Sequence, residues 1–166
     1  WGGPFVVCPS IGYLDRAYTD AKYGRVSGNP VFEIQVPSAV DPSLAPPGQH
    51  VMSILVQYAP YHRRDAAWDR AQAEALGDAV IWALGEYVPN LESSILHRQV
   101  HTPRSLEATF GLTEGNIYHG EMTLDQALFL RPVPGWAWYR TPIEGLYLCG
   151  AGTHPGGGVT GVPGYN

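Results

Sequence analysis

The stretch LYLCGAGTHPGGGVTGVPG, residues 146–164, carries most of the information about this chain. Its first four residues form a short apolar run of the kind that makes a buried strand. The glycines that follow leave main chain without side chains, so backbone N–H groups can approach an anion and a flat ligand meets no Cβ atom. A merely flexible loop is the alternative, because glycine-rich sequences also occur at mobile tips, and composition favours neither.

Gly156, Gly158 and Gly161 have the spacing of the dinucleotide-binding fingerprint, Gly-x-Gly-x-x-Gly. In that motif the loop turns directly out of its strand, whereas six residues separate Cys149 from Gly156 here. The match is therefore weak, and it does not indicate the first strand and turn of a Rossmann domain.

Upstream of this stretch, alternating apolar residues predict two strands, over 31–36 and 50–59. The proline-rich segment 41–48 between them is typical of a stiff connector. We expect the two strands to pair in a hairpin-like arrangement, and we expect a further strand over 95–101.

Apolar residues at helical spacing predict one long helix that begins at a cap, Asp65, and runs to about Val88, because Pro89 forbids continuation. A shorter helix should start at Pro103 and close at Gly111. Residues 124–130 are apolar but have no assignable period.

Composition limits the possible functions of the 166 residues. The net charge of -5 and the absence of a basic block argue against nucleic acid as the main partner. No apolar run reaches the roughly 18 residues of a membrane helix. Charged residues make up only 15% of the chain, and we interpret this low share as surface that a further part of a longer protein would cover. Two cysteines, Cys8 and Cys149, form no disulfide framework, so a reducing compartment is the default.

Candidate chemistry outside the glycine-rich stretch is sparse. His97 and His101 stand four apart without a third ligand, so we assign no metal. His119 and Glu121 copy half of a zinc deaminase signature, but Cys149 is not followed by the second cysteine that the other half needs.

Aromatic residues crowd the region before the last apolar run, and the sequence favours a core role for them: Trp136, Trp138, Tyr139 and Tyr147. Arg131 and Arg140 flank this group, and the sequence favours exposed positions for both.

The segment 139–164 resembles the C-terminal flavin-binding signature of phytoene-dehydrogenase-like FAD-dependent oxidoreductases. The resemblance extends upstream to AKYG (21–24), DPSLAPPG (41–48), VQYAPY (56–61) and GNIYHGE (115–121), so it covers nearly the whole chain.

The resemblance implies an α+β fold: a mixed or antiparallel sheet with one long helix, followed by the last strand and glycine-rich loop of a Rossmann-type FAD domain. Residues 1–138 would be part of a substrate domain and 139–166 the end of the FAD domain, whose first fingerprint is absent from this chain.

The resemblance also implies FAD as the cofactor and names its contacts. Residues matching Gly150, Gly152 and Thr153 pass close to the phosphate and ribityl portion of the flavin. Those matching Gly158, Val159 and Thr160 face the isoalloxazine ring. It identifies no catalytic side chain.

The implied activity is that of an oxidoreductase, in which a hydride passes from a substrate carbon to the flavin of the full-length protein. The alternative is a non-catalytic binding or assembly module on the same fold. The chain alone should be inactive and free of FAD. We expect a small, apolar substrate, a homodimer as one assembly, and the cytoplasm or another reducing compartment such as the mitochondrial matrix.

Overall fold

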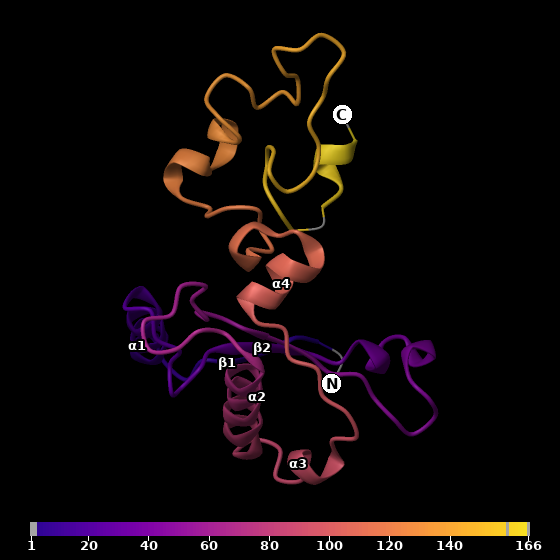
Figure 1. The fold of residues 1–166 in the computed structure, drawn as a ribbon. Coiled ribbons are helices and arrows are strands. Elements are labelled where there is room, and N and C mark those ends of the chain that lie inside the picture. Colours follow the sequence, from indigo (N-terminus) through magenta and orange to yellow (C-terminus); the bar gives the residue numbers. More distant parts are fainter. Residues whose placement is uncertain (1–2, 159, 166) are drawn as a thin grey trace. The chain divides into compact units, whose positions relative to one another are not determined.

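The chain forms two compact units, Trp1–Thr102 and Pro103–Asn166. The computed structural model describes residues 3–158 and 160–165. Helices α1, α2 and α3 and the sheet belong to the first unit, and α4 begins the second (Figure 1). Each unit is described separately below.

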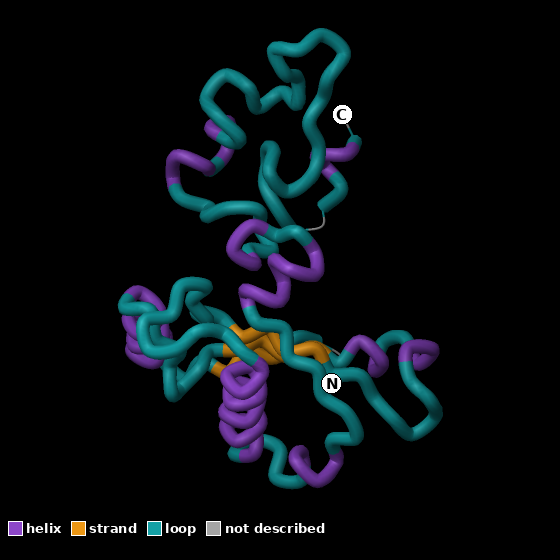
Figure 2. Tube along the Cα trace, in the orientation of Figure 1, coloured by secondary structure: helices purple, strands orange, loops and turns teal. Residues whose placement is uncertain are grey.

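The first unit contains a three-stranded antiparallel sheet in the order β1-β2-β3, built from Phe5–Val7, Phe32–Gln35 and Ser53–Val56. Phe32 lies opposite Val56, which fixes the register of the pair formed by β2 and β3. Figure 2 shows these strands together, with long loops between them. The predicted hairpin-like pair is therefore confirmed, although both strands are shorter than their alternating patterns.

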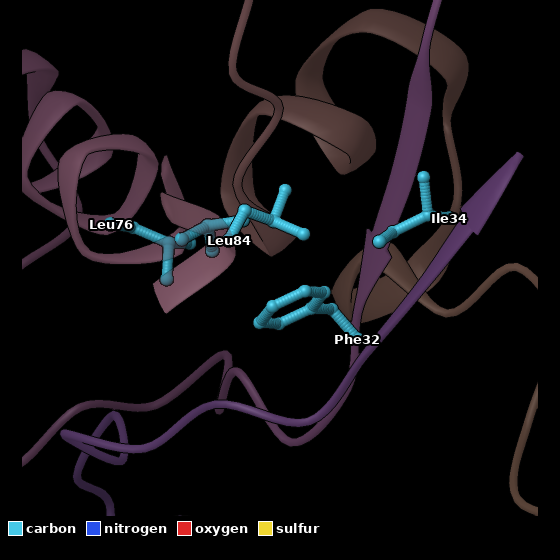
Figure 3. Close-up of a cluster of buried hydrophobic side chains, with 5 residues drawn as sticks. Phe32, Ile34, Leu76 and Leu84 are labelled. Carbon is cyan, nitrogen blue, oxygen red and sulfur yellow. The ribbon is translucent and has the colours of Figure 1, made fainter. Parts of the chain in front are cut away.

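The core of the first unit lies between the sheet and α2, Arg70–Gly85. Alternation in β2 places Phe32 and Ile34 on one face, and helical spacing places Leu76, Val80 and Leu84 on the facing side of α2. The labelled side chains of strand and helix point toward one another in Figure 3. All five are buried.

The predicted long helix begins later than expected and is not the only long one. Asp69, rather than Asp65, caps α2, because its side chain accepts a hydrogen bond from the backbone N–H of Gln72 at 2.8 Å. A second helix, α1, spans Ile11–Lys22 after a Ser10 cap. It buries only Ala17, so the sequence carries little of the apolar periodicity that would have predicted it.

The strand predicted over 95–101 is wrong. After the short helix α3, Leu91–Ser94, this segment has no ladder partner among the described residues. Side-chain contacts anchor it instead, since Arg98 pairs with Glu74 and Asp78 on α2. An apolar, β-branched pattern makes a strand only where a neighbouring strand offers its backbone groups.

The second unit begins with α4, Pro103–Phe110, which confirms the predicted short helix. Gly111 follows it with a φ of +68°, as a helix-terminating glycine requires. The ambiguous segment 124–130 forms two 3-10 turns, Leu124–Gln126 and Leu128–Leu130.

Two expectations about the second unit are corrected. Residues 146–149 form no buried strand: Tyr147 makes one isolated bridge to Arg140, and the whole run is exposed. The described part of the chain offers the run no second strand, so its backbone cannot form a ladder. Trp138 is 75% exposed and Tyr147 60%, so the aromatic group is not a core here.

The observed fold is thus α+β, with an antiparallel sheet and four helices. None of the helices within residues 3–158 and 160–165 is long and apolar enough to cross a membrane.

Candidate functional site

The glycine-rich stretch forms an exposed loop in the second unit. Gly150, Gly152, Gly158 and Thr160 are all exposed, as a ligand-contact segment requires. Gly150 and Gly158 have φ angles of +93° and +121°, a region that side-chain-bearing residues rarely adopt. Val159, also expected to contact the ligand, lies outside the described residues.

Thr153 differs from its neighbours because it is buried, at 4% exposure. Its hydroxyl donates a hydrogen bond to the carbonyl of Gly150 at 2.9 Å, and its backbone N–H donates to the same oxygen at 3.1 Å. Thr153 therefore closes a tight turn over residues 150–153, and its hydroxyl is occupied within the protein.

The outer side of this turn is bare main chain. A Cβ atom built on Gly150 or Gly152 would meet nothing within 4 Å. The backbone N–H groups of Ala151 and Gly152 have no acceptor in the described part of the chain. The turn can therefore receive a flat or negatively charged group against its backbone.

Arg131 lies behind the turn and was missed by the sequence patterns, which favoured an exposed position. Its side chain is 1% exposed. Nε donates to the carbonyl of Ala151 at 3.0 Å, and Nη2 donates to the carbonyls of Tyr118 and His119, both at 2.9 Å. Nη1 lies 3.0 Å from the sulfur of Met122. An arginine is buried because its fork can satisfy carbonyls from separate loops, a geometry that single-sequence patterns do not reveal.

Arg140, the other arginine beside the aromatic group, is exposed, as expected. His154 ties the loop to a second neighbouring segment. Its Nδ1 lies 2.7 Å from the carbonyl oxygen of Leu128, and its ring stacks on Phe129 with centroids 5.2 Å apart. Phe129 also stacks on Trp138, at 6.5 Å. Side chains from three segments therefore meet beside the turn.

No group of three or more histidine, cysteine or acidic residues is placed to hold a metal ion within 3–158 and 160–165. Cys149, at the start of the loop, is exposed and unpaired with Cys8. The arrangement consists of shaped main chain over a buried guanidinium, with no candidate nucleophile in its turn.

A family model described as flavin-containing amine oxidoreductase matches residues 13–164. Pyridine nucleotide-disulfide oxidoreductase domain-containing protein 2 of Rattus norvegicus is 46% identical over 160 residues, which cover 96% of this chain and 28% of that protein. The chain thus spans little more than a quarter of this relative's length.

Two bacterial proteins are similar over a shorter region. A polypeptide of the limonene dehydrogenase of Castellaniella defragrans is 37% identical over 76% of this chain and 24% of its own length. A lycopene-forming phytoene desaturase of Pseudescherichia vulneris is 36% identical over 76% of this chain and 25% of its own length. The resemblance to phytoene-dehydrogenase-like flavoproteins is confirmed by these matches.

Proposed function

Because the chain belongs to the flavin-containing amine oxidoreductase family, we propose that it is the C-terminal part of an FAD-dependent oxidoreductase and that the loop 150–160 contacts the flavin. The supporting observation is the exposed turn at Gly150 and Gly152, where main chain without side chains and two N–H groups without acceptors face outward. These residues fit a flavin because a planar ring system or a phosphate needs close backbone approach.

In the proposed site, Gly150, Gly152 and Thr153 lie near the phosphate and ribityl portion, and Gly158, Val159 and Thr160 face the ring. Thr153 shapes the turn through its bonds to the carbonyl of Gly150. The ring, when bound, supplies the acceptor for a hydride from a substrate carbon. The residues of the loop bind the cofactor, orient it and exclude water from one side. No proton transfer by a side chain is required of them.

The proposed substrate is a small apolar molecule, in keeping with the words limonene and phytoene in the names of the two bacterial relatives. We place residues 1–138 in a substrate domain and 139–166 in the FAD domain on the basis of the resemblance. Since the relatives are more than three times longer than the matched region, the remaining FAD contacts would come from elsewhere in the full-length protein. The 166-residue chain alone should therefore hold FAD poorly and be inactive.

Replacing Gly152 with alanine in the full-length protein tests the flavin contact. The added Cβ meets nothing within 4 Å in the protein itself, so folding should be unaffected. A methyl group on the outward side should hold the flavin away and weaken FAD binding at least about tenfold, or ~1.4 kcal/mol. Titration of the apoprotein with FAD measures this change.

Gly28→Ala is the matched control, because Gly28 is also exposed and a Cβ there also meets nothing within 4 Å. It should leave FAD affinity unchanged. Equal affinity of the Gly152 variant and wild type would contradict the proposed contact. Full-length protein that binds no FAD would instead favour the alternative, a non-catalytic binding or assembly module, which the many exposed apolar side chains of 103–165 also suit.

A further inference from the structure

The buried guanidinium of Arg131 has no charge partner. No carboxylate in the described part of the chain forms an ion pair with it, and its acceptors are three backbone carbonyls and one thioether sulfur. Carbonyl dipoles satisfy the N–H groups but do not neutralise a unit charge. Burial of an unpaired charge is costly, so a fold that retains one needs a compensating benefit.

The position of Arg131 fixes the direction of one peptide group. Its Nε holds the carbonyl of Ala151 inward at 3.0 Å. The peptide bond between Ala151 and Gly152 is not among the two cis bonds of the described chain, so it is trans. In a trans peptide the C=O and N–H point in opposite directions. The N–H of Gly152 is therefore turned away from Arg131.

A second carbonyl in the same turn is held in a similar way. The carbonyl of Gly150 accepts both the hydroxyl and the N–H of Thr153, so the N–H of Ala151 points away from Thr153. Two successive N–H groups are thus directed by anchored carbonyls, and neither has an acceptor within the described residues. Successive free N–H groups form a concavity that favours anions.

Small residues allow the guanidinium to lie this close to the loop. Gly156 has a φ of +112°, and a Cβ there would lie 3.0 Å from the Cε of Met122 and 4.0 Å from the Cδ of Arg131. A Cβ on Gly120 would lie 3.9 Å from Nη2. The charge is therefore packed directly beneath the turn.

We infer that Arg131 is a positioning residue for the flavin: it orients the N–H groups of the 150–152 turn and adds a buried positive charge that attracts a negatively charged part of the cofactor. This inference rests on the proposed flavin site. The negative charge belongs either to the phosphates or to the reduced, anionic ring, and the two sources respond differently in the experiment below.

The test compares Arg131→Met, Arg131→Gln and Arg131→Lys in the full-length protein, with Arg140→Met as the control because Arg140 is an exposed arginine of the same unit. FAD affinity is measured on the apoproteins, and the midpoint potential on the loaded proteins. Arg131→Met should weaken FAD binding at least about tenfold. Arg131→Lys, which keeps the charge, should lose less, and Arg140→Met should change affinity by less than about twofold.

The potential separates the two sources of negative charge. If Arg131 acts on the reduced ring, the midpoint potential falls in the methionine and glutamine variants but not in the lysine variant. If it acts on the phosphates, affinity falls while the potential stays constant, because the phosphate charge is the same in both oxidation states. Either result supports the inference.

Folding is monitored by the unfolding temperature of each apoprotein. If Arg131→Met does not fold, the glutamine and lysine variants decide, with the lysine variant expected to bind FAD more tightly than the glutamine variant. Unchanged affinity and potential in all three variants, or an affinity loss that only follows the loss of apoprotein stability, would overturn the inference. Wild-type protein that fails to bind FAD refutes the proposed function before any variant is compared.

Discussion

Two glycines with nearly equal backbone angles have different physical roles. Gly111 and Gly115 have φ angles of +68° and +69°. A Cβ on Gly111 would meet nothing within 4 Å, whereas a Cβ on Gly115 would lie 2.3 Å from the carbonyl oxygen of Pro103 and 2.6 Å from its Cα. Gly111 is required only for its backbone conformation, and Gly115 also for the close approach of two main-chain segments.

Gly111→Ala should therefore lower the free energy of unfolding by about 1–2 kcal/mol, the cost of a left-handed alanine. Gly115→Ala should cost clearly more, because backbone atoms cannot rotate out of the way. Urea unfolding of the full-length protein checks the pair. Equal losses in the two variants would mean that the α4 region relaxes around Gly115.

At the scale of the element, the start of α2 shows how a cap is chosen. Asp65 and Asp69 both precede the helical pattern, and both have the right chemistry. Only Asp69 bonds the N–H of Gln72. Asp65 instead accepts two hydrogen bonds from Arg63, which lower the pKa of its carboxyl group.

Asp69→Ala should lower the free energy of unfolding by about 1 kcal/mol through the lost cap. Asp65→Ala should have a smaller effect, since its carboxylate is solvated and Arg63 keeps its contacts with Gln72 and Trp68. Thermal unfolding at neutral pH distinguishes them. A larger loss for the Asp65 variant would place the helix start upstream, as the sequence pattern predicts.

At the scale of the whole molecule, the two units are stabilised differently. The first contains the cluster of Phe32, Ile34, Leu76, Val80 and Leu84. In the second, Ala137 is the single buried apolar side chain, other than proline, among the described residues. Hydrogen bonds from Arg131, Thr153 and His154 hold its loops. The exposed apolar side chains there suit cover by more polypeptide or by a second copy, so a homodimer stays a prediction.

Residues 1–102, produced alone, should unfold cooperatively, and Leu84→Ala should lower their free energy of unfolding by about 2–5 kcal/mol. Residues 103–166 alone should show no cooperative transition and should bind a hydrophobic dye such as ANS, because they bury too little apolar surface. Calorimetry and dye fluorescence test both halves. A sharp transition in 103–166 would contradict this division of stability.

The sequence by itself determined the β2 and β3 pair, the body of α2, the short helix α4 and the family, since each depends on local periodicity, turn chemistry or a continuous motif. The tertiary structure decided which aspartate caps α2, that 95–101 forms no strand, and that Arg131 is buried beneath the glycine turn. These features depend on backbone partners far away in sequence. Arg131 lies 20 residues from Ala151, and no local pattern encodes a hydrogen bond across that separation.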